Sequence, residues 1–85
     1  MPTGTPVNRQ WVVVLQDGSV VIEWGEGEFQ DALGGELIHG KSSQISHHAT
    51  TEDLERLKRA GRVEEFNDRI VYFQGLPEVP RKALD

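Results

Sequence analysis

The side chains best suited to bind a metal ion in this sequence are its three histidines, His39, His47 and His48. Together with a nearby Asp or Glu, imidazole nitrogens can hold zinc or nickel. The chain has no cysteine, which excludes disulfides, thiolate nucleophiles and Cys-type zinc sites. His47 and His48 are neighbours, and neighbouring side chains of a strand point to opposite faces, so on a strand they cannot share one ion. We therefore predict no metal and no cofactor, and interpret the histidines as surface or loop residues.

A second group of reactive side chains consists of carboxylates in a glycine-rich stretch, namely Glu23, Glu26, Glu28 and Asp31. Carboxylates perform general acid–base catalysis only where a cleft shifts their pKa values, and this stretch is expected to be an exposed connection. It also lacks the alternating-acid pattern of a calcium loop. No serine stands in a Gly-x-Ser-x-Gly setting that would mark a nucleophile. We predict that the protein is not an enzyme.

Charge is distributed unevenly along the 85 residues, whose net charge is −5. No Lys or Arg occurs between residues 10 and 40, whereas basic residues gather between residues 56 and 69. An acidic chain is poorly suited to nonspecific nucleic-acid binding, because such binding depends on neutralising phosphates with Lys and Arg. Nucleic acid is therefore an unfavoured partner, and we expect two sides of opposite charge.

The two ends of the sequence carry no sign of export or membrane insertion. The first residues lack the basic and apolar regions of a signal peptide, and no stretch approaches the length of a membrane span, so we expect a cytoplasmic protein without a membrane partner. Residues 1–9 contain two prolines, a glycine and little apolar content, and residues 75–85 contain two prolines. We interpret them as a flexible N-terminal tail and an extended or disordered C-terminal tail around a single domain at residues 10–74.

The elements that must position any site begin with a hairpin centred on Asp17-Gly18. An Asp-Gly pair between two β-branched runs is the strongest short-range hairpin signal. A two-residue loop at this pair places Val13 opposite Ile22 and Trp11 opposite Trp24. Because side chains alternate along a strand, one face then holds both tryptophans and is expected to form the core. The opposite face holds Val12, Val14, Gln16, Ser19, Val21 and Glu23.

Residues 28–39 admit two interpretations. A turn at Gly34-Gly35 would form a second hairpin that sets Ala32 opposite Leu37. Alternatively, residues 28–33 form a short helical turn. After a polar loop at residues 41–44, a short strand is expected from Ile45 to His48.

Helix signals converge on residues 51–60. Thr50 is a favourable N-cap, Asp53 stands at the third helical position as in a capping box, and Gly61 supplies a left-handed stop. The apolar stripe of this helix consists of Leu54, Leu57 and Ala60. Because a ten-residue helix is marginal alone, we expect it to dock on the hairpin face that bears the tryptophans.

Two β-rich segments after the helix predict a last hairpin, with an Asn-Asp pair at its turn. A two-residue loop pairs Val63 with Tyr72, whereas a three-residue loop pairs Val63 with Phe73 and Phe66 with Ile70. We favour the three-residue loop because it matches apolar partners across the strands.

Residues 54–73 read Leu-Glu-Arg-Leu-Lys-Arg-Ala-Gly-Arg-Val and then Glu-Glu-Phe-Asn-Asp-Arg-Ile-Val-Tyr-Phe. This stretch, about a quarter of the chain, resembles the recognition-helix end and β-wing of winged-helix transcription regulators. The resemblance implies a helix in the major groove of DNA and contacts from Arg56, Arg59, Arg62 and Arg69. The upstream part departs from that family, because a Val-rich hairpin stands where two or three helices are expected.

The sequence thus predicts an α+β fold, a small antiparallel β-meander of four to six strands with one short helix packed on one face. One short helix cannot cover both faces of the first hairpin, so the second face is expected to remain as an interface. The predicted interface residues are Val12, Val14, Val21, Glu23, Glu26 and Glu28. The favoured function is a small regulatory or adaptor protein that binds another protein or a second copy of itself, as a homodimer. The alternative is a winged-helix-like DNA-binding regulator.

Overall fold

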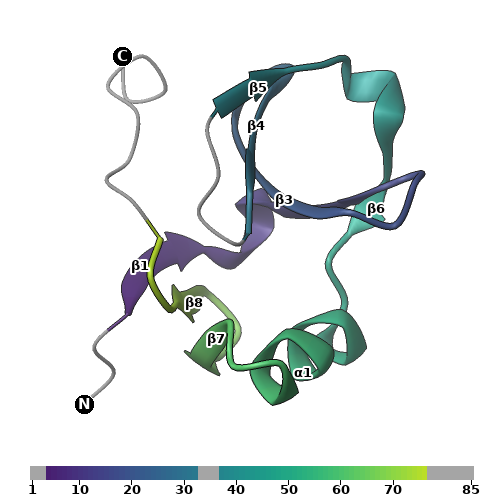
Figure 1. Ribbon diagram of the computed structural model, residues 1–85. Coiled ribbons are helices and arrows are strands. Elements are labelled where there is room, and N and C mark those ends of the chain that lie inside the picture. Colours follow the sequence, from purple (N-terminus) through teal and green to yellow (C-terminus); the bar gives the residue numbers. More distant parts are fainter. Residues whose placement is uncertain (1–3, 33–36, 77–85) are drawn as a thin grey trace.

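Figure 1 shows the computed structural model, which describes residues 4–32 and 37–76 as two antiparallel sheets and one α-helix, α1 (Thr51–Arg59). This arrangement confirms the α+β class. The smaller sheet has the strand order β1-β8-β7 and consists of β1 (Thr5–Asn8), β7 (Val63–Phe66) and β8 (Ile70–Phe73). The larger sheet has the order β5-β4-β3-β2-β6 and consists of β2 (Val12–Leu15), β3 (Val20–Gly25), β4 (Glu28–Asp31), β5 (Leu37–His39) and β6 (Ile45–His48). Two single-turn 3-10 helices, η1 (Arg9–Trp11) and η2 (Ser42–Gln44), precede β2 and β6.

The β2–β3 hairpin forms at the expected place, but its register differs from the expected one by one residue. Val13 pairs with Val21 and not with Ile22. The loop therefore holds three residues, and the amide of Gly18 donates to the carbonyl oxygen of Leu15 at 2.9 Å. Gly18 has a φ of +92°, which suits the left-handed residue that ends such a loop. This slip turns β2 over relative to β3, so different side chains share a face.

The two tryptophans meet, although not as partners in a ladder. Trp11 lies in η1, outside the strands, and its ring centroid is 5.4 Å from that of Trp24 in an edge-to-face arrangement. Trp24 is buried and donates its Nε1–H to Oε1 of Gln30 at 2.8 Å, whereas Trp11 is 41% exposed. The predicted contact is confirmed, and the predicted cross-strand pairing is wrong because η1 replaces the end of the strand.

Both faces of the β2–β3 hairpin are buried, each in a different apolar cluster. The first cluster joins the two sheets and α1, and it includes Val12 and Val14. The second cluster consists of Val13, Leu15, Val21 and Phe29, with Ile45 packed against it. In Figure 1 the strands of the larger sheet curve around a common centre, which this second cluster fills.

The expectation that one face of the hairpin stays uncovered is therefore wrong. The exposed fractions of Val12, Val14 and Val21 are 0%, 8% and 1%. Curvature of the larger sheet buries one apolar face within the sheet itself, while the helix and the smaller sheet cover the other. Val12 and Val21 are enclosed by their own chain and present no surface to a partner, while Val14 keeps only a small exposed edge.

Part of each expected tail belongs to the folded structure. Thr5–Asn8 form β1, in which Val7 pairs with Val71 of β8 and is buried. The expectation of a loose tail over residues 1–9 is wrong for this strand, because the partner strand lies far away in the sequence. Leu76 is also buried in the first cluster. The rest of the two expected tails, residues 1–3 and 77–85, lies outside the described residues.

The remaining predicted strands of the larger sheet are present. β4 and β5 pair as in the hairpin interpretation of residues 28–39, but Gln30 lies opposite Leu37 where Ala32 was expected. The predicted turn at Gly34-Gly35 lies outside the described residues. β6 spans Ile45–His48 as expected and pairs with β2.

The β7–β8 hairpin keeps one pair of the predicted three-residue register and departs from both predicted registers near its turn. Val63 pairs with Phe73, as the three-residue loop requires. A bulge between Val63 and Glu65 then shifts the ladder, so Phe66 pairs with Val71 and not with Ile70. The extra residue of a bulge changes the register partway along a hairpin.

The helix follows its local signals closely. Thr50 is the N-cap of α1, and its hydroxyl accepts a hydrogen bond from the amide of Asp53 within a capping box. Gly61 has a φ of +76° and ends the helix in the left-handed conformation. Leu54 and Leu57 pack on the first cluster together with Trp24, so α1 docks on the side of the sheet that bears this tryptophan.

Candidate functional site

A groove runs between the loop of the β2–β3 hairpin and α1, and we call it the hairpin–helix groove. It consists of two adjoining hollows of about 250 Å³ each. The first hollow is lined by Val14, Gly18, Val20, His47, Asp53, Arg56 and Leu57. The second is lined by Ser19, Val20, Asp31, Ala32, Leu57 and Arg62. Because Val20 and Leu57 line both, the two hollows form one continuous surface.

The floor of the hairpin–helix groove is apolar. Val14 and Ala32 are buried, while Val20 and Leu57 are only partly buried and pack against the first cluster. Val14 pairs directly with Val20 in the observed register, so both side chains lie on one face of the hairpin. With the two-residue loop they would point to opposite faces, and this floor would not form.

Asp53 marks one end of the groove with a buried carboxylate, 6% exposed. Its Oδ2 accepts hydrogen bonds from the amide of Thr50 at 2.9 Å and from the Thr50 hydroxyl at 3.0 Å, and it lies 3.1 Å from Nε2 of His47. Its Oδ1 accepts a hydrogen bond from Arg56. Burial raises the pKa of the Asp53 carboxyl, but the bonds from Thr50, His47 and Arg56 outweigh it and lower the pKa to about 2. The carboxylate is therefore ionised and fully occupied.

Two arginines stand at opposite ends of the groove. The side chain of Arg56 is 65% exposed, although it pairs with Asp53. Arg62 follows the turn at Gly61. Its backbone amide donates to the carbonyl oxygen of Leu57 at 3.0 Å, and its carbonyl oxygen accepts a hydrogen bond from the amide of Gln74 at 2.9 Å. Its side chain makes no ion pair with any residue in the described ranges.

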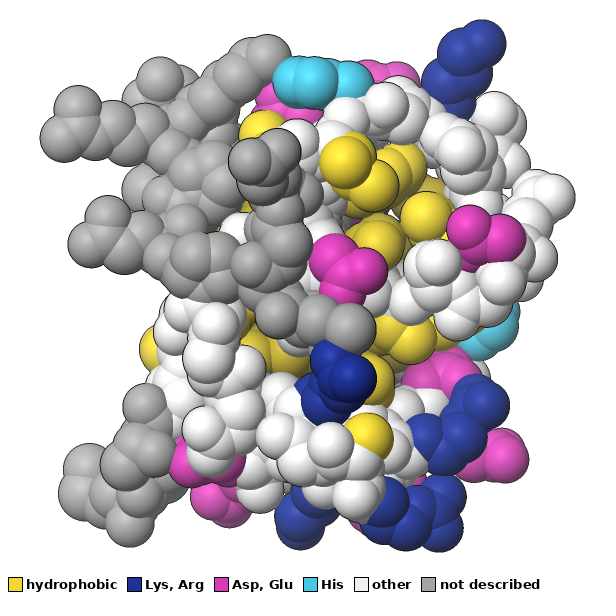
Figure 2. Space-filling model, viewed as in Figure 1, with side chains coloured by type: hydrophobic (Ala, Val, Ile, Leu, Met, Phe, Trp, Pro, Cys, Tyr) yellow, Lys and Arg dark blue, Asp and Glu magenta, His cyan; other side chains and the backbone are white. Residues whose placement is uncertain are grey.

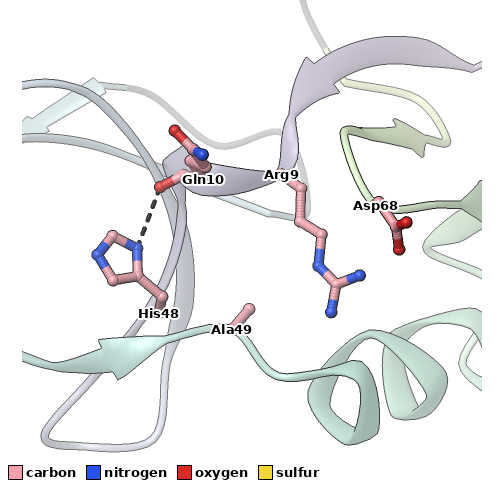
Figure 3. Close-up of a pocket in the computed structure, with 5 residues that line it drawn as sticks. All are labelled: Arg9, Gln10, His48, Ala49 and Asp68. Atoms are coloured by element: carbon pink, nitrogen blue, oxygen red, sulfur yellow. Dashed lines mark hydrogen bonds between the residues drawn. The ribbon is translucent and has the colours of Figure 1, made fainter.

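A larger cleft of about 420 Å³ is lined by Arg9, Gln10, His48, Ala49 and Asp68 (Figure 3). The Arg9 guanidinium donates to Oγ1 of Thr51 at 2.8 Å and to the carbonyl oxygen of Asn67 at 3.2 Å, and it lies 5.8 Å from the ring centroid of Phe66. His48 turns away from it in Figure 3 toward the backbone of η1. Arg9 thus holds η1, α1 and the β7–β8 turn together, and this role accounts for its position.

The structure separates the three histidines. His47 and His48 are neighbours on β6, but His47 faces Asp53 while Nδ1 of His48 lies 3.1 Å from the carbonyl oxygen of Gln10. His39 lies on β5, at the other edge of the larger sheet. Across residues 4–32 and 37–76, no group of three or more His, Asp or Glu residues could hold a metal ion.

The predicted interface acids and DNA contacts lie at different ends of the molecule. Glu23 lies about 10 Å along β3 from Val20, and Glu26 and Glu28 lie beyond the end of β3, which is about 16 Å from Val20 at about 3.3 Å per residue. Of the predicted DNA contacts, Arg56 and Arg62 line the groove, whereas Arg59 is exposed on α1 and Arg69 lies in the β7–β8 turn. In Figure 2 most Lys and Arg side chains gather in the lower half, where α1 and the smaller sheet lie, with acidic side chains among them.

Sequence reasoning assigned Val20 and Leu57 to the core and missed their role as the floor of a groove. The alternation of β3 and the helical stripe correctly indicate that both side chains face inward. Whether an inward-facing side chain is fully covered depends on how closely the hairpin loop and α1 approach each other. No local signal in the sequence reports that distance.

No protein-family model, curated protein or solved structure matches this chain. Within the part of the chain that the structure describes, no helix has the length and apolar content needed to cross a bilayer. The shape and chemistry of the hairpin–helix groove are therefore the basis for assigning a function.

Proposed function

We propose that this protein is a small, non-enzymatic regulatory or adaptor protein that binds a segment of another protein in its hairpin–helix groove. The observation that carries this proposal is the continuous apolar floor of Val20 and Leu57, with an arginine at each end. Protein interfaces typically combine an apolar centre with a polar rim, and arginine is enriched in them. The predicted function is thus kept, while its site moves from the buried valines to the groove.

The size of the hollows favours a peptide segment over a small molecule. Each hollow, at about 250 Å³, lies below the roughly 300–1,000 Å³ of small-molecule sites, and the two reach that range only together, as open hollows side by side and not as one enclosed cavity. Each therefore suits a single large side chain. Two such hollows in a row suit a segment that presents two apolar side chains on one face, as peptide-recognition grooves commonly do.

The polar end of the groove supports binding rather than catalysis. Ser46, His47 and Asp53 do stand in a row, with Oγ of Ser46 3.1 Å from Nδ1 of His47 and Nε2 of His47 3.1 Å from Asp53. Ser46, however, lines neither hollow, so a substrate seated in the groove would not meet its hydroxyl.

A selection experiment tests this function. A library of short random peptides is displayed on phage and selected on the full chain, and the enriched peptides are then measured against two variants. Leu57→Gln keeps a good helix former but makes the groove floor polar, so peptide binding should weaken at least fivefold. Ile38→Gln is the matched control, because Ile38 is an exposed apolar residue on β5, outside the groove. If no peptide is enriched, or if both variants bind the peptides equally, the groove is not the binding site.

One observation favours the alternative, a DNA-binding regulator. The helix α1 is followed by the β7–β8 hairpin, and exposed Arg59 and Arg69 stand on these two elements. However, Glu52 and Glu55 are exposed on the same helix, and the chain has a net charge of −5. A labelled DNA duplex distinguishes the two functions. DNA binding would depend strongly on salt and be lost in Arg59→Glu, whereas peptide binding would not change in that variant.

A further inference from the structure

We infer that the segment bound by the hairpin–helix groove is acidic, with two apolar side chains in the hollows and a carboxylate beside Arg56. This inference rests on the proposed function and adds the chemical class of the partner. The inference follows from which polar groups at the ends of the groove can still form hydrogen bonds or ion pairs with a partner. The Arg56 end and the Arg62 end differ in these groups.

The Arg56 end presents hydrogen-bond donors and almost no acceptors. The carboxylate of Asp53 is buried, and its two oxygens already receive bonds from Thr50, His47 and Arg56. A partner therefore cannot use Asp53 as an acceptor. Arg56 uses one terminal nitrogen for that pair, while its side chain is 65% exposed and a guanidinium carries five N–H donors. The group that matches a planar set of such donors is a carboxylate, which can accept two parallel bonds.

The Arg62 end attracts an acid less strongly. Arg62 has no ion pair with a described residue, but Asp31 lines the same hollow and supplies a negative charge of its own. Attraction of a partner carboxylate by Arg62 is thus partly cancelled by Asp31. We therefore assign the acidic anchor of the partner to the Arg56 end and an apolar side chain to the Arg62 end.

A second copy of this chain fits the groove poorly. Its acidic β3–β4 turn carries Glu26, but the flanking Trp24 and Phe29 are buried and offer no side chain to the hollows. The large exposed hydrophobic residues of the described ranges, Trp11 and Ile38, lie beside the residues that flank this turn, but they stand on two separate elements, η1 and β5, so no single segment presents both to the hollows. A head-to-tail contact between copies would also leave one groove and one turn open at the ends. The partner is thus a different protein.

Fluorescein-labelled peptides test this inference by anisotropy with the full chain. The probes are short peptides with two leucines at varied spacing, flanked by aspartates, by asparagines or by lysines. We expect the aspartate peptide to bind about three- to tenfold more tightly than its asparagine twin at low salt, and the lysine peptide to bind weakest. The preference for aspartate should shrink as salt is added.

Paired arginine variants locate the preference. Arg56→Gln should abolish the preference for aspartate, and Arg56→Lys should restore part of it. Arg59→Gln is the matched control, because Arg59 is exposed on the same helix but lines neither hollow. Thermal melts of all variants identify any loss of folding, and Arg56→Lys still tests the charge if Arg56→Gln is unstable.

The possible outcomes separate this inference from the proposed function. If the aspartate and asparagine peptides bind equally, and both are lost in Leu57→Gln, the groove binds peptides but the acidic partner is wrong. A preference for the lysine peptide overturns the inference in the same way. If no probe binds, and no peptide is enriched from the display library, the proposed function falls as well. If sedimentation shows that the protein self-associates, and Leu57→Gln prevents this, a second copy occupies the groove and the inference is overturned.

Discussion

Asp53→Asn is the perturbation that most directly tests how the polar end of the groove is held together. The carboxylate of Asp53 is 6% exposed and interacts with Thr50, His47 and Arg56. Burial alone would raise its pKa, but these bonds lower the pKa from 3.8 to about 2. Asparagine keeps the shape of the side chain and removes its charge.

The expected loss of stability follows from the change in pKa. A fall from 3.8 to about 2 means that the folded protein binds this proton about sixtyfold more weakly than the unfolded chain, which corresponds to about 2.5 kcal/mol. Solvent screens the exposed Arg56, so we expect about 2 kcal/mol at neutral pH. A chain of this length has a total stability of about 4–13 kcal/mol, so this single side chain supplies a substantial share.

The sign of the pH dependence follows from the lowered pKa. Because the folded value lies below the unfolded one, the contribution of Asp53 is complete above about pH 5 and disappears as the pH falls through about 2. Urea unfolding monitored by tryptophan fluorescence at several pH values measures this. The stability difference between the parent and Asp53→Asn should be largest at neutral pH and vanish near pH 2. Taking differences cancels the titration of the other carboxylates.

Glu52→Gln is the matched control, because Glu52 is the neighbouring acid in the first turn of α1 and is exposed. It should change the unfolding midpoint little at any pH. The reasoning is refuted if Asp53→Asn is as stable as the parent at pH 7. It is also refuted if the loss is as large near pH 2 as at pH 7, because the stabilisation would then not depend on the ionised carboxylate.

Four further outcomes are expected. Gly61→Ala should lower stability by about 1 kcal/mol in urea unfolding, because the residue has a φ of +76° while an added Cβ meets nothing within 4 Å; an unchanged midpoint would contradict this. Val14→Lys should lower stability by more than 2 kcal/mol, since it places a charge in the first cluster, whereas a variant that melts like the parent would show the position to be exposed. Trp11→Ala should cost about 1 kcal/mol in urea unfolding, and an unchanged unfolding midpoint would argue against its contact with Trp24. Zinc titration by calorimetry should give no stoichiometric isotherm, and a one-to-one isotherm that is lost in His47→Ala would disprove this.

The helix shows how far local chemistry determines structure in this chain. The start of α1, its capping box and its stop at Gly61 agree with the sequence prediction. These features depend on bonds between residues a few positions apart, such as Thr50 and Asp53, and on the backbone freedom of one glycine. The stripe of Leu54 and Leu57 likewise indicates which side of the helix is buried.

The first hairpin shows where local chemistry leaves two solutions. Gly18 can supply a positive φ in a two-residue or a three-residue loop, so the Asp-Gly pair identifies the turn but not its length. Packing decides between them. The observed register places Val14 beside Val20 under α1 and Val13 beside Val21 inside the curved sheet, so each pair lies in one cluster.

Long-range pairing accounts for the strand that the sequence concealed. Thr5–Asn8 is short and contains a proline, which weakens any local β signal. It becomes a strand because β8 offers a free edge, although Val7 and its partner Val71 stand far apart in the sequence. Burial of Val7 offsets the entropy of ordering the segment, and this contact exists only in the folded protein.

By itself, the sequence determined the α+β class, the helix with both its ends, the places of the main turns and the arginines on and after α1. Tertiary structure alone decided that both faces of the first hairpin are covered and that the opening lies between its loop and the helix. Arg56, Arg62 and Leu57 are recognisable from the sequence as basic or apolar residues of a helix and its end. They line one groove with Val20 only because the register of β2 on β3 and the docking of α1 bring together segments that no local interaction connects.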